Sequence, residues 1–309
     1  MNIFRYKYAI VASLAVVAWS VTACDEDDDD SNILFGQKTE TPAATDSTQT
    51  STISTSSYTK RLEVPALKEG NQFYYHTSIE GKDTVMTFCF EYDFSKFHSR
   101  WIAFRFDEVT RPKVVSRKNN DSEVLYQHDE LLPTQYMIDD DESFDGYDHG
   151  HLCASADRLY SRTANDNTFY MTNMSPQIGS FNQQYWTSYE SYVQTKGRDA
   201  SFADTLYVVK GGTIDSDENI IKYVCKGRMA MPKYYYMALL KVKNNTYTAM
   251  AFLMEHKTYD GAPTTAQMAE KIVTIDYLEE FTGIDFFHNL PDVIENVVEA
   301  SVAPTAWGF

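Results

Sequence analysis

Basic residues are scarce in this 309-residue chain. Lys and Arg number 27 against 44 Asp and Glu, which gives a formal net charge of −17. Nucleic-acid-binding proteins are usually basic, so the composition argues against tight binding of a polyanion. It leaves room for weak, salt-sensitive binding through a local basic strip or a bound divalent cation.

Several catalytic and metal-binding patterns are missing. The chain has no Gly-x-Ser-x-Gly nucleophile elbow, no phosphate-binding P-loop and no His-Glu-x-x-His zinc motif. Its four cysteines form no Cys-x-x-Cys pair, which excludes the common structural zinc spacings. Internal repeats are absent too, so a solenoid or propeller is not expected.

The few cysteines leave two alternatives open. Besides Cys24 there are Cys89, Cys153 and Cys225. In an exported protein Cys153 could pair with Cys225 and brace the neighbouring loop, leaving one thiol over. Three unpaired buried thiols are the alternative.

The N-terminal segment has the composition of a secretory signal. Arg5 and Lys7 precede an apolar stretch at 9–21, which is too short for a comfortable membrane span. The stretch ends in Val-Thr-Ala-Cys, which resembles the lipobox of bacterial lipoproteins. The resemblance implies a signal peptide over 1–23, cleavage before Cys24 and acylation of that cysteine, which would anchor the chain to a membrane. An ordinary signal peptide with an incidental cysteine is the alternative.

Residues 24–60 are predicted to be a disordered tether. Positions 25–30 are all acidic and should stay solvated, and 39–59 are mostly Thr, Ser, Ala and Gln. The acidic block also resembles the surface-export tag of some Gram-negative lipoproteins, with a plain spacer as the alternative. The expected location is the outer membrane or cell surface of a Gram-negative bacterium, or the periplasmic face.

Residues 61–309 are long enough for one domain with a sizeable core. An apolar stripe at helical spacing predicts a helix at 181–196, and a second helix is predicted at about 265–281. Runs of β-branched and aromatic residues predict strands at 85–92, 101–106, 205–210, 233–242 and 247–254. We expect an α+β fold, in which helices flank a mixed, largely antiparallel central sheet.

The segment 107–147 is polar and interrupted by Pro112 and Pro133, so it should run outside the sheet toward the site. Within it, 139–142 and Asp145 offer carboxylates that could bind calcium. No EF-hand pattern is met, and a solvated acidic turn is the favoured alternative.

The most informative stretch lies at 146–158. Asp148, His149 and His151 surround Gly150, whose missing side chain would let the backbone aim His151 at a fixed point. A neutral imidazole is suited to take a proton from water near neutral pH. A polar turn without chemistry is the alternative.

Two later pieces add to this stretch. Asn173 is predicted to end a strand. Ser-Pro-Gln follows at 175–177, and a helix comes after it. Asn182 and Glu190 are eight residues apart and so share one side of that helix, about 12 Å apart along its axis. The alternatives are a helix cap for Asn182, a surface charge for Glu190 and a turn residue for Asn173.

Together these pieces resemble the DNA/RNA non-specific endonuclease family of the endonuclease G type, whose active site is a ββα-metal motif. The family pattern is Asp-Arg-Gly-His, then a strand ending in Ser/Thr-Asn-x-x-Pro-Gln, then a helix that begins with Asn and continues with Trp and Glu. The likeness extends from about residue 70 to the end, through later landmarks at 208–212, 231–235 and 282–287.

The resemblance implies hydrolysis of DNA and RNA to 5′-phosphate ends with Mg²⁺, or Mn²⁺, as the cofactor. His151 would be the general base and Asn182 the one direct protein ligand of the metal. Glu190 would hold waters around the metal, and Asn173 would orient the site. Asp148 would fix the catalytic loop or a histidine tautomer.

One position departs from the family pattern. His149 stands where the family has Arg, a permanently charged fork for phosphate. If His149 carries the charge instead, the rate should be bell-shaped in pH, because His151 must be neutral while His149 is protonated. Arg158 and Arg162 are candidate phosphate contacts, with surface ion pairs as the alternative.

Two other functions remain open. The first is a nuclease-fold lipoprotein that binds a partner or polyanion without cutting it. The His149 departure and the acidic composition favour it slightly, while the joint presence of His151, Asn182 and Glu190 disfavours it. The second is a phosphodiesterase that acts on a smaller substrate at the same site.

Overall fold

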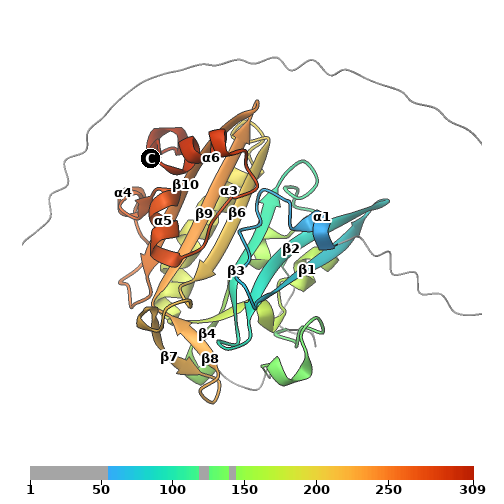
Figure 1. The fold of residues 1–309 in the computed structure, drawn as a ribbon, viewed down its shortest axis with the longest axis vertical. Helices are drawn as coiled ribbons and strands as arrows, with labels where there is room; N and C mark the ends of the chain where they lie inside the picture. Colours follow the sequence, from blue (N-terminus) through green and yellow to red (C-terminus); the bar gives the residue numbers. More distant parts are fainter. Residues whose placement is uncertain (1–54, 118–124, 139–143) are drawn as a thin grey trace, which may run out of the picture. The chain divides into compact units, whose positions relative to one another are not determined.

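An antiparallel sheet of seven strands runs through the folded part of the chain (Figure 1). The computed structural model describes residues 55–117, 125–138 and 144–309. Neighbouring strands lie in the order β1-β2-β3-β6-β9-β10-β11, and every pair is antiparallel. The strands are β1 (Gln72–Glu80), β2 (Asp83–Asp93), β3 (His98–Phe106), β6 (Thr205–Gly212), β9 (Tyr234–Lys243), β10 (Thr246–Glu255) and β11 (Ile272–Val273). The predicted α+β class and all five predicted strands are confirmed.

Both faces of the sheet are buried, because different helices cover them. Phe90 and Phe104 point into one apolar cluster, which α3 (Thr187–Arg198) completes. Trp101, three positions before Phe104 on β3, points into a second cluster, which α5 (Ile275–Thr282) completes. Side chains on a strand alternate between faces, so two covered faces require apolar residues at successive positions. The continuous apolar runs that predicted these strands have this origin.

The single helix predicted at about 265–281 is wrong. The structure has a short α4 (Thr265–Ala269), then the edge strand β11, then α5. The two β11 residues, Ile272 and Val273, are β-branched and prefer extended backbone, and they pair with β10. Thr274 then starts a new helix, because its side chain accepts a backbone N–H of the first turn of α5.

The helix predicted at 181–196 is confirmed, but its first turn is wider than expected. Phe181–Trp186 form a π-helical turn that leads directly into α3. The backbone N–H of Thr187 donates to the carbonyl of Asn182, five residues earlier. π-Helical turns are rare in proteins as a whole, and those that occur are often found at functional sites.

Smaller elements gather near one end of the sheet, where β4, β7 and β8 lie together (Figure 1). Where the structure describes the predicted excursion 107–147, it contains short 3₁₀ turns and one isolated β-bridge, in keeping with the prediction. The remaining elements are α1 (Thr55–Tyr58), α2 (Arg162–Asn167), α6 (Asp292–Glu299), β4 (Asp148–His151), β5 (Met174–Gln177), β7 (Ile220–Val224), β8 (Met229–Pro232) and 3₁₀ turns at 134–136, 144–146, 155–157, 171–173, 217–219 and 304–307.

Cys89, Cys153 and Cys225 are buried, and none of the three forms a disulfide in the described structure. The alternative without a disulfide is therefore the one found. Cys153 packs in the cluster beneath α3, whereas Cys225 packs in a separate cluster around Met229 and Met231.

Some predictions concern residues outside the described ranges. The signal peptide, most of the tether and the acidic positions 139–142 are among them. Within the described ranges, no helix is both long enough and apolar enough to span a membrane.

Candidate active site

Strands β4 and β5 form a two-stranded antiparallel ladder, and the π-helical turn and α3 follow in the chain. Gly150 stands opposite Ser175 in this ladder. A Cβ at position 150 would lie only 2.2 Å from Oε1 of Gln177, so any other residue would force the buried Gln177 side chain to move. We expected glycine here because it can adopt a backbone conformation closed to other residues, and that reason is wrong. Gly150 is not among the glycines with positive φ. The close approach of the Gln177 side chain, and not the backbone conformation, favours glycine at this position.

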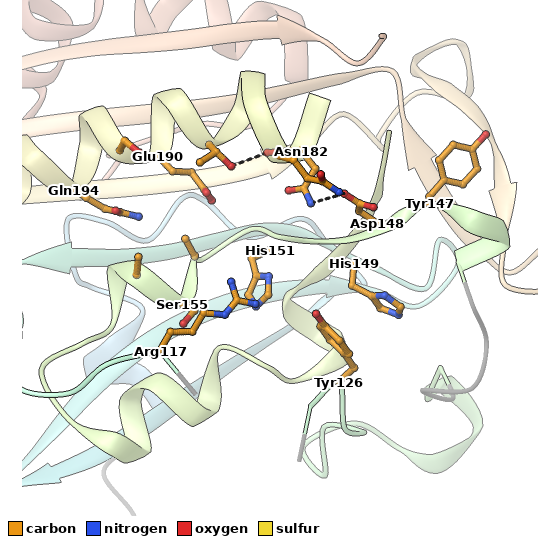
Figure 2. Close-up of a pocket in the computed structure, with 15 residues that line it drawn as sticks. Arg117, Tyr126, Tyr147, Asp148, His149, His151, Ser155, Asn182, Glu190 and Gln194 are labelled. Atoms are coloured by element: carbon orange, nitrogen blue, oxygen red, sulfur yellow. Dashed lines mark hydrogen bonds between the residues drawn. The ribbon is translucent and has the colours of Figure 1, made fainter. Parts of the chain in front are cut away.

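One cavity of about 700 Å³ opens over this ββα unit (Figure 2). Five of the residues predicted from the sequence line it: Asp148, His149, His151, Asn182 and Glu190. The structure therefore brings together residues that are up to 42 positions apart in the chain. The other lining residues are Arg117, Tyr126, Tyr147, Ala154, Ser155, Ala156, Gln183, Thr187, Ser191 and Gln194.

A carboxylate fixes the orientation of the Asn182 amide. Oδ2 of Asp148 accepts hydrogen bonds from Nδ2 of Asn182 at 2.9 Å and from Nε2 of Gln183 at 2.8 Å. A carboxylate can only accept, so the amide NH₂ of Asn182 must face Asp148 and its Oδ1 is left available. Asn182 lies inside the helical turn, whose N-cap is Ser180, so the capping alternative for Asn182 is wrong. Asp148 positions Asn182, a role that the sequence did not suggest.

His151 is half-buried, and its ring meets that of Phe169 edge-on, with centroids 5.2 Å apart and planes at 89°. Its Nε2 is buried and has no hydrogen-bond partner in the described structure. Burial, and then the positive charge of Arg117, lower the pKa of His151 to about 3. The imidazole is therefore neutral at physiological pH, as a general base must be.

Arg117 is the one lysine or arginine among the described residues that line the cavity. Its guanidinium lies beside His151 (Figure 2) and 5.4 Å from the ring centroid of Phe169. A guanidinium is permanently charged and matches phosphate with two parallel hydrogen bonds. No sequence pattern selects Arg117, because it lies in an irregular segment, far from the motif and at no recognisable spacing.

Glu190 connects the cavity with a buried ion pair. Its Oε1 accepts a hydrogen bond from Nε1 of Trp186 at 3.0 Å and lies 3.8 Å from Nζ of Lys210. Lys210 is fully buried and also pairs with Oδ2 of Asp157 at 2.7 Å. The Glu190 side chain is only 12% exposed, so the alternative of a surface charge is wrong.

Burial raises the pKa of Glu190 to about 7, and the ammonium of Lys210 opposes that rise. Without Lys210, the carboxylate would be still harder to ionise. Lys210 was not among the predicted site residues, although a single lysine within the apolar strand β6 is itself a sign of a buried ion pair.

His149 lies in an aromatic stack. Its ring is nearly parallel to those of Tyr126 and Phe144, with centroids 4.4 and 4.2 Å away. Burial lowers its pKa from the usual histidine value, although Asp148 acts in the opposite direction. The direction of this shift opposes the expectation that His149 replaces the charge of the family arginine, and Arg117 supplies a charge to the cavity instead.

Asn173 is fully buried and lies behind the catalytic loop rather than in the cavity. Its Oδ1 accepts the backbone N–H of Cys153 at 2.8 Å, and its Nδ2 donates to the carbonyl of the same residue at 2.8 Å and to that of Thr168. These bonds hold the chain two residues after His151. The prediction that Asn173 ends a strand is wrong, because it is the last residue of the 3₁₀ turn before β5. Its bonds position the loop without touching the site.

The two predicted phosphate contacts do not line the cavity. Arg158 is fully buried between the rings of Phe104 and Phe106, at 4.5 and 4.9 Å, and donates to backbone carbonyls. That burial is incompatible with contact to a substrate phosphate. Arg162 forms an ion pair with Asp166 on its own helix, which is the alternative stated for it.

Comparison with known proteins gives consistent matches. A family model described as DNA/RNA non-specific endonuclease matches residues 68–293. Nuclease C1 of Cunninghamella echinulata var. echinulata is 30% identical over 156 residues, which cover 48% of this chain and 60% of the relative. Mitochondrial endonuclease G of Caenorhabditis elegans is 24% identical over 218 residues, covering 67% of this chain and 68% of the relative.

A solved structure supports the fold. The crystal structure of the EndoG/EndoGI complex contains a chain that superposes with a TM-score of 0.57 at 18% identity. The match covers 72% of this chain and 89% of that chain. The chain thus spans about 60–68% of the length of the two nucleases quoted above, and nearly all of this solved chain.

Proposed function

Because the chain belongs to the DNA/RNA non-specific endonuclease family, we propose that it is a metal-dependent nuclease that hydrolyses phosphodiester bonds of both DNA and RNA. One observation carries this proposal: three groups of complementary chemistry meet at one cavity. They are the unpartnered Nε2 of His151, the amide oxygen of Asn182 and the carboxylate of Glu190. A base and a set of oxygen ligands for a cation are what metal-assisted phosphodiester hydrolysis requires.

The residues of the cavity fit Mg²⁺ or Mn²⁺. Both ions prefer oxygen ligands, and the bond to Asp148 leaves the neutral oxygen of Asn182 available as a direct ligand. Glu190, two helical turns further on, would hold water molecules around the ion. When bound, the ion supplies positive charge that stabilises the phosphate and the leaving oxygen in the transition state.

The other side chains have separate tasks. His151 would accept a proton from the attacking water at Nε2, because its ring is neutral and that nitrogen has no other partner. Arg117, beside His151, would bind a phosphate oxygen through its guanidinium. Asp148 keeps the Asn182 amide in one orientation, and Asn173 keeps the His151 loop in place.

We expect a soluble form of the chain that begins at residue 25 to relax supercoiled plasmid and to degrade RNA in Mg²⁺. Added chelator should abolish both activities, because Arg117 would then be the one lysine or arginine among the described lining residues left to offset the negative charge of the transition state. End analysis should find 5′-phosphates. Cleavage that persists at full rate in chelator would contradict metal dependence, and binding without any cleavage would favour the non-catalytic alternative.

That alternative is a nuclease-fold lipoprotein that binds a partner or a polyanion. The net charge of −17 and the lowered pKa of His149 favour it. The unpartnered Nε2 of His151 and the oriented amide of Asn182 favour catalysis instead, because neither arrangement serves binding alone.

A second prediction concerns the proton on His151. We expect its imidazole to stay neutral in metal-free protein down to about pH 4, since its pKa is lowered to about 3. Arg117→Gln removes a positive charge that disfavours protonation, so the midpoint should move to higher pH. NMR titration of the His151 ring protons measures this directly. A midpoint near 6.5 in both proteins would show that neither burial nor Arg117 acts on the ring as described.

We also propose that Cys24 carries lipid and that the chain is a membrane-anchored lipoprotein of a Gram-negative bacterium. Cys24→Ser should release the protein into the soluble fraction, because several acyl chains on one residue anchor a protein firmly. Mass spectrometry of the mature N-terminus checks the cleavage site. A mature chain that begins anywhere other than Cys24 would overturn this part of the proposal.

A further inference from the structure

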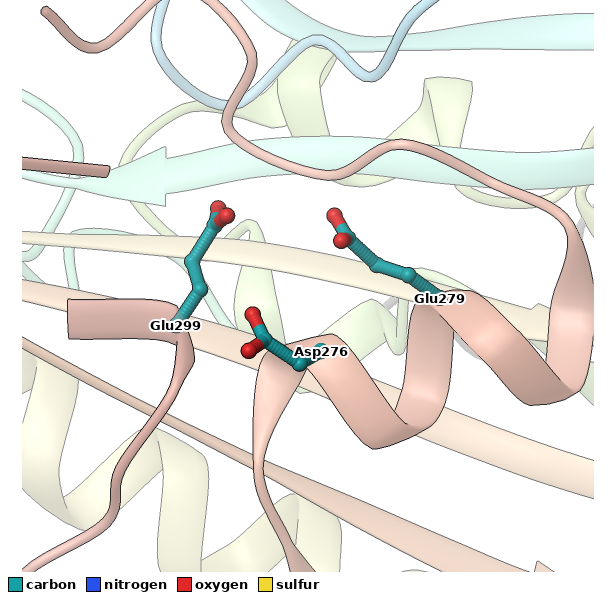
Figure 3. Close-up of side chains that lie close together, drawn as sticks. All are labelled: Asp276, Glu279 and Glu299. Atoms are coloured by element: carbon teal, nitrogen blue, oxygen red, sulfur yellow. The ribbon is translucent and has the colours of Figure 1, made fainter. Parts of the chain in front are cut away.

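Three carboxylates meet on the face of the sheet that α5 and α6 cover (Figure 3). Asp276 and Glu279 come from α5, and Glu299 is the last residue of α6. One oxygen of each lies within 4.8 Å of one oxygen of both others. Helices that are adjacent in sequence thus place three carboxyl groups around one small space.

The buried member of this cluster has an unsatisfied oxygen. Glu299 is only 5% exposed, and its Oε1 is buried without a hydrogen-bond partner. Leaving a buried carboxylate oxygen unpaired is costly. Its place in the last turn of α6 adds to that cost, because the carbonyl end of a helix repels negative charge.

The surroundings of Glu299 make its charge still less favourable. Burial raises its pKa to about 9, and the charged groups that add most to this rise are carboxylates, Glu279 and Glu295 first. In the described ranges, no lysine or arginine forms an ion pair with Asp276, Glu279 or Glu299. The protein itself therefore offers no cation to compensate the cluster.

From this geometry we infer that Asp276, Glu279 and Glu299 form a binding site for a calcium ion. Ca²⁺ takes six to eight oxygen ligands at about 2.3–2.6 Å, so two of its ligands can lie about 4.6–5.2 Å apart. The three oxygens lie within 4.8 Å of one another, so one ion with such a flexible coordination geometry can reach all three. Mg²⁺ demands near-ideal octahedral geometry at about 2.0–2.1 Å and usually takes one or two carboxylates besides its waters, so a site with three protein carboxylates suits it less well.

One carboxylate is already oriented for this purpose. Oε1 of Glu279 accepts the backbone N–H of Phe286 at 2.7 Å. That bond holds the side chain toward α6 and leaves its second oxygen to a cation. Waters would complete the coordination, since Asp276 is exposed to solvent.

The calcium site is separate from the candidate active site. Ile275 and Leu278 of α5 pack in the apolar cluster on one face of the sheet, whereas Tyr189 and Val193 of α3 pack in the cluster on the other. Calcium bound here would join α5 to the end of α6. Its expected effect is therefore on stability, and its test does not depend on cleavage.

Isothermal titration of the metal-free protein with Ca²⁺, in excess Mg²⁺ that occupies the catalytic cavity, tests this inference. We expect one site of saturable binding and a rise in Tm of about 3–5 °C at calcium ten times its Kd. Glu299→Gln keeps the shape of the side chain and should lose both effects. Glu280→Gln removes an exposed charge from α5 outside the cluster and should retain both.

Two results would overturn the calcium site. One is the absence of saturable Ca²⁺ binding in the wild-type protein under these conditions. The other is the same binding and the same rise in Tm in Glu299→Gln as in the wild type. If Ca²⁺ has no effect but Glu299→Gln raises Tm at neutral pH, a proton rather than a metal compensates the cluster.

Discussion

His151→Ala is expected to lower the cleavage of DNA and RNA by at least ~100-fold, the lower range for loss of a general base. The structure gives the reason: His151 lines the cavity, and its buried Nε2 has no partner in the described structure, in a ring that is neutral at physiological pH. Single-turnover cleavage of supercoiled plasmid measures the effect. The thermal transition should change little, because the ring lines a cavity rather than the core.

His288→Ala is the matched control for this variant. His288 is a half-buried histidine in the segment that follows α5, and it does not line the cavity. We expect its replacement to leave the cleavage rate unchanged. Near-wild-type cutting by purified His151→Ala would remove His151 from the mechanism.

Asn182→Ala should cause a loss of similar size, again at least ~100-fold, because it removes the neutral oxygen proposed as the direct metal ligand. The defect should depend on metal: cleavage by the variant should require more Mg²⁺ than cleavage by the wild type. Rates measured over a series of Mg²⁺ concentrations test both points.

Gln183→Ala separates this role of Asn182 from a merely structural one. Gln183 and Asn182 donate to the same oxygen of Asp148, at 2.8 and 2.9 Å. Losing the Gln183 bond leaves the Asn182 amide oriented by its own bond, so we expect a loss of less than about tenfold. Equal losses in the two variants would mean that the hydrogen bonds to Asp148, and not the Asn182 oxygen, matter for cleavage.

The strands were predictable because their signal is local. Runs such as Phe88 to Phe90 carry apolar side chains on successive positions, and two covered faces of a sheet demand that pattern. The prediction of one helix at about 265–281 was wrong because apolar spacing in the sequence does not reveal strand pairing with a distant part of the chain. Ile272 and Val273 pair with the edge strand β10, and only the three-dimensional neighbourhood decides that.

In the site too, residues with a local sequence signal were predictable and the others were not. Asp148, His151, Asn182 and Glu190 stand in short motifs, so the sequence was enough to select them. Arg117 comes from an irregular segment, and no spacing connects it with the motif.

The burial of individual side chains could not be predicted from the sequence either. Arg158 stands close to the motif and carries the right charge for phosphate, yet its side chain lies between the rings of Phe104 and Phe106. Gly150 was selected correctly but for the wrong reason, since the obstacle is the side chain of Gln177 on the partner strand. Sequence patterns identify candidate groups, and packing determines which of them can reach a ligand.

Chemical rescue of His151→Ala by added imidazole tests the central claim, proton transfer at this position, most directly. The cavity of about 700 Å³ has room for the free base. We predict that imidazole restores part of the plasmid cleavage in proportion to its concentration, that more basic imidazoles restore more, and that Asn182→Ala gains nothing from it. If the folded His151→Ala protein shows no response to any imidazole, His151 does not act as the base, and the proposed mechanism is wrong.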